Sequence, residues 1–334
     1  METVPALFLT GLMVGYFVLA GCDIGLGMLL PHLARTPAER RRLVAAAAPY
    51  FLGTEVWLVG AVGVVAGLFP ALKAALVADL WPVLTALLAG WLLRDAGLWF
   101  RSRVAAPAWH RTWEAAITAG SWVLAGAWGL VVGGLLAGGS PASPFALACA
   151  VCVTALFALR GAAFGAERLV PPEAEPVTVP GPPAAGGGAL LVAARAGTAV
   201  DSAEAADAAG RATRVLARAA LAAGGVAAAA ALITGAAPDR PVAALAAAAV
   251  LGAVLAATAG LSGPRLSRHT SALAIAVPPL VVAAAVALPV EPVPGGTLAL
   301  VGYALAPVVP LMVLGQVWLY RMLRRPAPTA GFFA

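Results

Sequence analysis

This sequence consists largely of apolar segments, and several are long enough to cross a lipid bilayer as a helix. The first runs from Val4 to Leu30, and its one charged residue is Asp23. A helix needs about 20 predominantly apolar residues to span the hydrocarbon core of a membrane. Several segments reach that length, and 62% of all residues are hydrophobic while only 11% are charged, which excludes a water-soluble domain. The sequence therefore predicts an all-α integral membrane protein.

Turn residues and charges divide the apolar segments into nine predicted membrane spans. The spans are about 4–31, 50–70, 74–98, 114–137, 144–165, 212–235, 242–262, 270–290 and 297–321. The N-terminal sequence METVP has no basic region, and the first apolar run is far longer than the apolar core of a signal peptide. We therefore expect the first span to remain in the mature protein.

The basic residues predict how the chain is oriented. In the nine-span arrangement all but two of the 21 Lys and Arg residues fall on one side, the exceptions being Lys73 and Arg240. Short cytoplasmic connections carry such an excess, so we expect the N-terminus outside and the C-terminus in the cytoplasm. The arginines are spread over several connections without an aromatic platform between them, and nucleic acid is therefore not an expected partner.

The longest connection divides the chain into two parts. Residues 171–188, PPEAEPVTVPGPPAAGGG, are rich in Pro and Gly and predict a flexible linker. The Ala-rich segment after it predicts a surface helix that leads into the sixth span. We expect five spans in residues 1–170, a cytoplasmic linker with this surface helix in 171–211, and four spans with a short cytoplasmic tail in 212–334.

Three ionisable residues are predicted to meet in the cytoplasmic half of the membrane. Asp23 lies eight residues before Pro31, hence about 12 Å along the helix from its cytoplasmic end. Glu55 enters the second span to about 7 or 8 Å by the same rise per residue. Arg94, near the cytoplasmic end of the third span, is their cationic partner. Intramembrane charges are costly and favour function, so two interpretations stay open: a cluster that fixes helix packing, and a polar path for protons or related to quinol.

Cysteines and histidines do not predict a metal or haem site in this chain. Cys149 and Cys152 have C-x-x-C spacing but lie within the fifth span, where thiols are usually packing residues, as we also expect of Cys22. The histidines fall at the ends of spans: His32, His110 and His269. An axial haem ligand is expected within a helix bundle, so we expect neither haem nor metal to be bound here.

Five segments, in order, resemble subunit II of cytochrome bd-type quinol oxidases. They are GCDIGLGMLLP followed by ERRR, PYFLGTEVWLV, LLRDAGLWFRSR, WHRTWEAAITAGS and VVPLMVLGQVWLYRMLRR. The family patterns at the first three are Gly-Phe-Asp-x-Gly-x-Gly, Pro-x-Trp-Asp-Gly-Asn-Glu-Val-Trp-Leu and Arg-Gly-x-x-Phe-Glu-x-Arg. The positions that match them are Gly21, Asp23, Gly25, Gly27, Gly53, Glu55, Trp57, Arg94 and Arg101.

The chain also departs from the family pattern. Trp-Asp-Gly-Asn falls on residues 51–54, where Leu52 replaces the acid. Asp95 stands where the pattern has the glycine after arginine, and Gly315 where it usually has tyrosine. A proton route that relies on an acid at position 52 cannot operate unchanged here. The resemblance therefore implies a divergent member.

The resemblance implies a subunit of a terminal oxidase that oxidises quinol and reduces dioxygen to water during aerobic respiration in the bacterial cell membrane. In that family two haems b and one haem d are held by subunit I, and subunit II is a haem-poor heterodimer partner with a similar nine-helix fold. The positions that match the family motifs, among them Asp23, Glu55, Arg94 and Arg101, would then support a polar path and the contact between subunits, without performing bond chemistry.

Two alternatives remain from the residues themselves. A secondary transporter or proton channel would use Asp23 and Glu55 beside helices broken at glycine, although no convincing inverted repeat is found. A paralogue that assembles with a subunit I-like protein without oxidase activity is favoured by the loss of the acid at Leu52.

Overall fold

The computed structural model of this chain describes residues 3–168, 187–236, 238–260, 264–288 and 294–322. Within these ranges the helices are α1 (Thr3–Leu33), α2 (Pro37–Leu68), α3 (Pro70–Phe100), the short 3-10 turn η1 (Arg101–Arg103), α4 (Pro107–Leu136), α5 (Pro144–Arg168), α6 (Gly187–Thr234), α7 (Pro241–Gly260), α8 (Pro264–Ala285) and α9 (Gly295–Met322). These described segments contain no strand. Eight of the helices are long and apolar enough to span a membrane, and α2 contributes a shorter apolar stretch, Gly53–Leu68. The prediction of an all-α integral membrane protein is confirmed.

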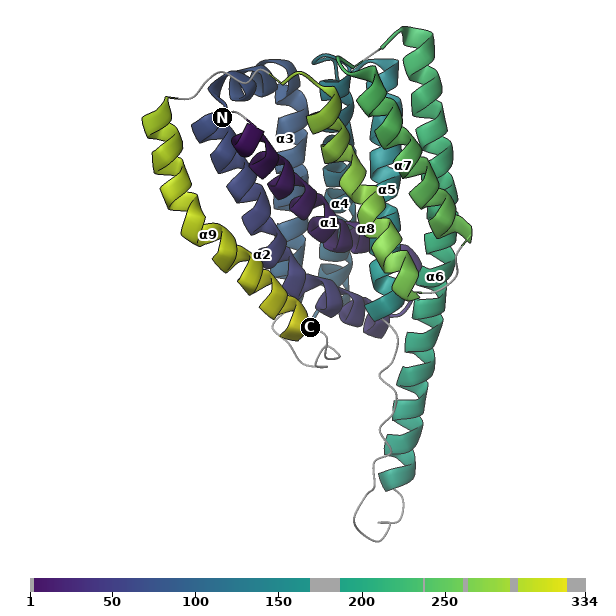
Figure 1. Ribbon diagram of the computed structural model, residues 1–334. Coiled ribbons are helices and arrows are strands. Elements are labelled where there is room, and N and C mark those ends of the chain that lie inside the picture. Colours follow the sequence, from purple (N-terminus) through teal and green to yellow (C-terminus); the bar gives the residue numbers. More distant parts are fainter. Residues whose placement is uncertain (1–2, 169–186, 237, 261–263, 289–293, 323–334) are drawn as a thin grey trace.

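The first eight helices form two four-helix units that share a long interface (Figure 1). In the first unit α1 packs against α2 and α4, and α3 packs against α4. In the second unit α5 packs against α6 and α8, and α7 packs against both of its sequence neighbours. The units meet where α5 lies along α1 and α4, and where α8 lies along α1. Helices α1 and α5 are therefore central to the molecule.

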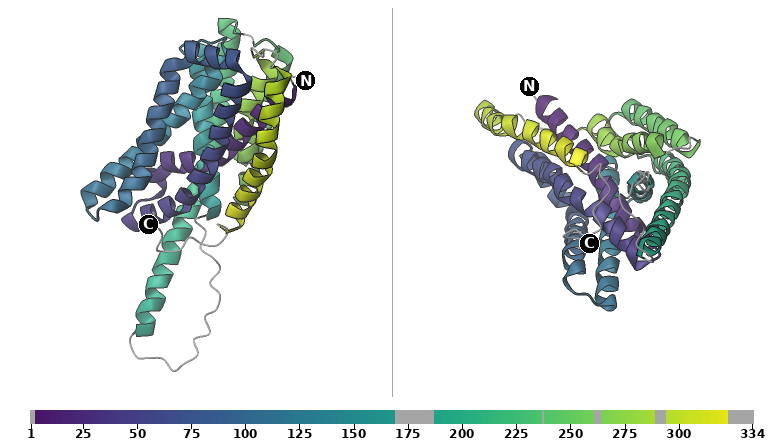
Figure 2. Two further views of the ribbon diagram at one scale, coloured as in Figure 1. Left: turned by 90° about the vertical axis from the view of Figure 1, so that its left-hand side faces the viewer. Right: turned by 90° about the horizontal axis from the view of Figure 1, so that it is seen from below.

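Helix α9 is peripheral to both units. Figure 2 shows it lying along the outside of the bundle, and its main contacts are with α2. Val301, Leu305 and Met312 pack onto a cluster of apolar residues between α1 and α2, whereas Leu311 and Leu314 are exposed. One side of α9 is thus attached to the first unit, and its other side is apolar and exposed with respect to the described residues.

Helix α2 begins well before its predicted apolar span, which we placed at about residue 50. Thr36 and Glu39 form a capping box: the Thr36 hydroxyl accepts from the Glu39 backbone N–H at 3.2 Å, and the Glu39 carboxylate accepts from the Thr36 N–H at 3.0 Å. Pro37 follows at the first helical turn, where its missing N–H costs nothing. The predicted boundary marked the start of the apolar stretch, because hydropathy does not detect a helix made of charged residues.

Helix α6 joins two elements that the sequence separates. The predicted surface helix and the sixth span form one continuous helix of 48 residues, Gly187–Thr234. Its first part projects beyond the end of the bundle (Figure 1). The Pro- and Gly-rich linker predicted at 171–188 lies outside the described residues up to residue 186. Alanine-rich sequence continues a helix across the membrane boundary because no proline or cap residue stops it.

Helix α8 is displaced toward the N-terminus relative to its predicted span of 270–290. It begins at Pro264 and ends at Ala285. Proline is favourable at the first position of a helix. The first turns of α8 are polar, so the apolar stretch alone does not indicate where the helix begins. The same cause therefore shifts α2 and α8: helices start in the polar interface, before the apolar stretch begins.

The two units are joined by a very close approach of α1 and α5. A Cβ atom at Gly25 would collide with the Phe157 carbonyl oxygen and the backbone of Gly161, and one at Gly161 would collide with the backbone of Gly25. Small residues allow helices to approach until their backbones touch. Beside this contact the rings of Phe17, Trp128 and Phe157 pack with centroids 5.3 to 5.4 Å apart. Asp23 lies in the same stretch of α1, so this contact holds it at a defined depth.

Candidate functional site

Arg94 is the centre of a buried ion cluster built from α1, α2 and α3. Its Nη1 donates to Asp23 Oδ2 at 3.4 Å and its Nη2 donates to Glu55 Oε1 at 3.3 Å. The side chains of Arg94 and Asp23 are each only 4% exposed. The other oxygen of Asp23, Oδ1, accepts the backbone N–H of Ile24 at 2.8 Å. The structure brings together Asp23 and Glu55, which helix rise predicted to lie at similar depth, and Arg94, their predicted cationic partner.

Asp95 is a fourth member of this cluster, and its place there was not predicted from the sequence. Its Oδ1 accepts from Arg94 Nε at 2.9 Å and lies 2.9 Å from Nη2. Glu55 also accepts from the indole N–H of Trp91 at 2.7 Å. The side chains of Glu55 and Asp95 are each 19% exposed. The cluster thus extends from buried Asp23 to the outer surface of the chain between α2 and α3.

Three carboxyl groups in this cluster face a single guanidinium. Arg94 contacts Asp23, Glu55 and Asp95, and no second cation is paired with these carboxyl groups in the described part of the chain. Like charges in a medium of low dielectric constant repel strongly, and ionised carboxylates there are costly to bury. An arrangement with more acids than cations at membrane depth can therefore take up and release protons.

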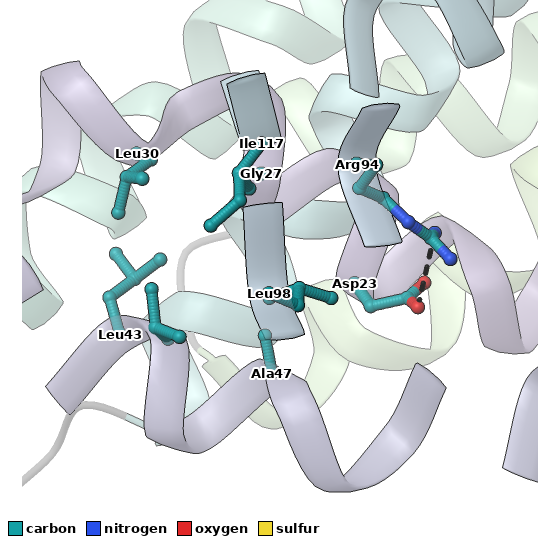
Figure 3. A pocket seen from close by; sticks show the side chains of 9 residues that line it. Asp23, Gly27, Leu30, Leu43, Ala47, Arg94, Leu98 and Ile117 are labelled. Carbon is teal, nitrogen blue, oxygen red and sulfur yellow. Dashed lines mark hydrogen bonds and ion pairs between the residues drawn. The ribbon is translucent and has the colours of Figure 1, made fainter. Parts of the chain in front are cut away.

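A small cavity borders the inner end of the cluster. Its volume is about 20 Å³, enough for roughly one water molecule. Figure 3 shows Asp23 and Arg94 paired at one side of the cavity. The residues that line it are Asp23, Gly27, Leu30, Leu43, Val44, Ala47, Arg94, Leu98 and Ile117. Apart from the ion pair, the walls are apolar.

A second buried ion group lies on the other side of this cavity. Glu114 Oε1 accepts from Arg101 Nε at 3.1 Å and from Arg101 Nη2 at 2.9 Å. Glu114 Oε2 accepts from Arg40 Nη1 at 3.0 Å. Arg101 is buried, while the side chain of Arg40 is 30% exposed. The group, Arg40–Glu114–Arg101, therefore connects the protein surface to the buried interior.

Helix register places the cavity between the two ion groups. On α3, Leu98 lies between Arg94 and Arg101. On α4, Ile117 comes one turn after Glu114, and on α2, Leu43 comes one turn after Arg40. Along α2 and α3 the order of groups is therefore the same: a member of the surface-linked ion triad, the apolar cavity, and the Arg94 cluster, while α4 supplies Glu114 and the cavity residue Ile117.

The sequence did not predict the triad, although both of its buried members, Arg101 and Glu114, lie in the quoted motifs. Arg101 was assigned only as a motif residue, and Glu114 is the acid of WHRTWE. Their pairing depends on α3 and α4 being neighbours, which sequence spacing does not reveal. The signal that was available is the motif itself, which contains an acid beside the membrane boundary.

Arg160 is a buried cation of a different kind. We counted it among the arginines that flank the fifth span, but it is only 6% exposed and lies between α1, α5 and α8. Its Nε donates to the Val18 carbonyl at 3.1 Å, and its Nη1 donates to the Arg268 carbonyl at 2.8 Å and to Ser271 Oγ at 3.2 Å. The described residues include no carboxylate paired with it. A guanidinium has several donors, and here they join three helices.

The cysteines and histidines stand apart from the ion groups. Cys149 and Cys152 are buried free thiols in α5, and Cys152 Sγ lies 3.7 Å from the Ala220 carbonyl oxygen of α6. His32 and His269 are exposed near helix ends, and His110 is half-buried at the start of α4. Over the described ranges no group of three or more His, Cys, Asp or Glu residues is placed to hold a metal ion.

Comparison with known proteins identifies the family. The model for cytochrome bd terminal oxidase subunit II matches residues 1–323. The chain belongs to this family. As a cytochrome bd subunit II it is a multi-pass protein of the bacterial plasma membrane, since eight of its described helices can span a bilayer and its relatives are bacterial.

Three curated relatives are similar over part of their length. A probable cytochrome oxidase subunit 2 of Haemophilus influenzae is 30% identical over 168 residues, which cover 45% of this chain and 44% of the relative. The cytochrome bd-I ubiquinol oxidase subunit 2 of Escherichia coli is 33% identical over 127 residues, covering 38% and 34%. The cytochrome bd ubiquinol oxidase subunit 2 of Bacillus subtilis is 30% identical over 110 residues, covering 33% and 32%. The matched segments span less than half of each relative.

The residues that match the subunit II pattern take distinct places. Gly21 and Gly27 leave room for neighbours, since a Cβ atom would strike Arg160 at the first and Ser121 at the second. The ring of Trp57 packs on Gly15 of α1, which has no side chain there. Gly53 is half-buried in α2, one turn before that ring. The glycines of the pattern therefore set helix spacing around the ion groups and do not themselves carry chemistry.

Proposed function

We propose that this chain is the subunit II of a quinol oxidase that reduces dioxygen to water, and that it supports a haem-bearing subunit I as its heterodimer partner. The match of the subunit II family model to residues 1–323 carries this proposal. The relatives from Escherichia coli and Bacillus subtilis are named as ubiquinol oxidase subunits. Two haems b and one haem d would belong to subunit I, where they supply the electron transfer, with quinol as the substrate.

We propose further that the Arg94 cluster and the adjoining cavity form part of a proton path. The path would start at the surface-linked triad, pass the cavity beside Asp23, and reach Glu55 and Asp95 at the seam between α2 and α3. Reduction of dioxygen to water consumes protons, so a subunit that spans the membrane can assist by delivering them. In this role Asp23 and Glu55 hold protons, Arg94 stabilises their carboxylates, and none of the three touches the reacting oxygen.

The surface position of Glu55 and Asp95 supports a partner at that seam. Both side chains are 19% exposed, and carboxyl groups facing lipid at membrane depth are costly. A partner that covers the seam removes this cost and receives the proton. The apolar outer face of α9 gives a second surface for lipid or for subunit I.

Purification of the intact complex tests the oxidase assignment. The complex should contain a subunit I-like protein, show haem d absorbance and consume dioxygen with quinol as the electron donor. This chain expressed alone should bind no stoichiometric haem. A complex that assembles with a subunit I-like protein but lacks haem d and oxidase activity would establish the paralogue, which the loss of the acid at Leu52 favours.

The packing interpretation of the cluster is tested by Asp23→Asn in the complete complex. Replacing the acid by a neutral group of the same shape should lower quinol-supported dioxygen consumption while haem content stays that of the parent. If an assembled Asp23→Asn complex had the turnover of the parent, the interpretation that the cluster only fixes helix packing would be supported. Solute transport by reconstituted chain without subunit I would instead favour the transporter.

The orientation is tested by reporter fusions. We propose an external N-terminus and a cytoplasmic C-terminus, because all but two of the 21 Lys and Arg residues share one side of the predicted topology. Fusions after Ala334 and within residues 171–188 should both report the cytoplasm. An external signal from either would contradict the nine-span topology.

A further inference from the structure

Asp95 is the one member of the Arg94 cluster that the family pattern does not contain. The pattern has glycine after the arginine, and it has an acid before the glycine that is Gly53 here. This chain has Leu52 at the acid position and gains an acid at position 95. The sequence alone does not show whether the two changes are related, because positions 52 and 95 lie on different helices.

The structure places the new acid next to the remaining one. Asp95 Oδ1 and Glu55 Oε1 both contact the same atom, Arg94 Nη2, at 2.9 and 3.3 Å. Because both oxygens contact this one nitrogen atom, the carboxyl groups of Glu55 and Asp95 lie close to each other. They also share the same exposure, 19%, at the seam between α2 and α3. Position 52 precedes Glu55 by three residues, which is about one turn of α2.

We propose that Asp95 and Glu55 form a proton-sharing pair at the end of the path, and that Asp95 supplies on α3 the acid that the family pattern has on α2. This inference rests on the proposed proton path. A proton on a Glu55 oxygen moves to a carboxylate oxygen of Asp95 as one O–H bond breaks and the other forms, so the negative charge moves to Glu55. Arg94 contacts one oxygen of each carboxyl group and stabilises the negative charge on either side.

Asp95 acts here by holding a proton, and Arg94 positions it. Nε and Nη2 of Arg94 both contact Asp95 Oδ1, so Oδ1 is held and Oδ2 is the oxygen that remains for the proton. Asp95 is half-buried. The indole N–H of Trp91 holds Glu55 in the same way through Oε1 at 2.7 Å.

The test uses the complete complex carrying Asp95→Asn, Asp95→Glu, or Asp95→Gly combined with Leu52→Asp. Asp79→Asn is the matched control, because Asp79 is an exposed acid on the same helix, about 24 Å away along its axis. Haem content reports assembly, and quinol-supported dioxygen consumption and proton uptake report turnover. The pH dependence of turnover separates a proton-holding role from a structural one.

Asp95→Asn should lower turnover and proton uptake about tenfold or more, with haem content unchanged. Asp95→Glu should keep most of the activity with a shifted pH profile, the double variant should regain activity, and Asp79→Asn should match the parent. Parental turnover in Asp95→Asn together with a loss in Asp23→Asn would overturn this inference and leave the proposed path intact. Parental turnover in both variants would overturn the path itself. If Asp95→Asn does not assemble, the double variant decides: an assembled but inactive double variant contradicts the proposal, and an active one supports it.

Discussion

The two four-helix units bury charge in opposite ways. In the unit α1–α4, buried Arg94 and Arg101 are paired with carboxylates from neighbouring helices. In the unit α5–α8, buried Arg160 donates to two backbone carbonyls and a hydroxyl. Both arrangements satisfy their donors, so hydrogen bonding does not distinguish them. The distinction is whether the partners can change their charge.

Because of this difference, protonation can change the charge of the first unit but not the contacts of Arg160 in the second unit. A carboxylate can take up a proton, so the charge of the first unit can change. Arginine stays charged, and carbonyl and hydroxyl groups stay neutral, so the contacts of Arg160 do not vary with proton supply. We therefore expect substitutions in the first unit to affect both assembly and turnover, and those in the second unit to affect assembly alone.

The largest effect is expected from Arg94→Leu. The change leaves three carboxyl groups without their cation at membrane depth, and breaking a buried ion pair costs about 3–5 kcal/mol. The yield of assembled complex and its thermal stability in detergent should both fall sharply. Arg211→Leu, at an exposed position of α6, is the control and should stay near the parent. An Arg94→Leu complex as stable as this control would break the comparison.

Asp23→Leu should have the next largest effect. Arg94 keeps Glu55 and Asp95 as partners, so the expected loss is about 3 kcal/mol, at the lower end of the range for a broken buried pair. Thermal unfolding of the purified complex measures the loss, and its residual turnover should also be reduced. Unchanged stability together with unchanged turnover would show that the first unit does not depend on this acid.

Arg160→Leu should cost about 2 kcal/mol, because it leaves acceptor oxygens unpaired but no carboxylate behind. The same thermal unfolding assay applies. Turnover per assembled complex should equal that of the parent, in contrast to Asp23→Leu. A loss of turnover in fully assembled Arg160→Leu complex would show that the second unit also affects turnover. The proposed difference between the two units would then be wrong.

The smallest effect is expected from Cys149→Ala and Cys152→Ala. Each removes one buried sulfur, and the loss should be about 1 kcal/mol, similar to that of one buried methylene group. Assembly and turnover of both variants should be close to those of the parent. A cysteine variant that failed while Asp23→Leu behaved like the parent would reverse our ranking of the sites.

The sequence by itself determined the class of fold, and it predicted that Asp23, Glu55 and Arg94 meet. Continuous runs of about 20 apolar residues predict membrane helices, because a helix satisfies its backbone hydrogen bonds within the segment itself. The fixed rise of a helix converts residue number into depth, and this was sufficient to place Asp23 and Glu55 at similar levels near Arg94. Helix starts were predicted less well, as at Pro37, because a capping box in polar sequence gives no hydropathy signal.

Only the tertiary structure decided which charged groups meet. Depth along the axis does not reveal the rotation of a helix or the identity of its neighbours. For that reason the sequence did not predict the pairing of Glu114 with Arg101, the burial of Arg160 between α1, α5 and α8, or the contact of Asp95 with the Arg94 cluster. Each of these depends on how closely the helices pack. At Gly25 and Gly161 the absence of a side chain allows the backbones of α1 and α5 to touch.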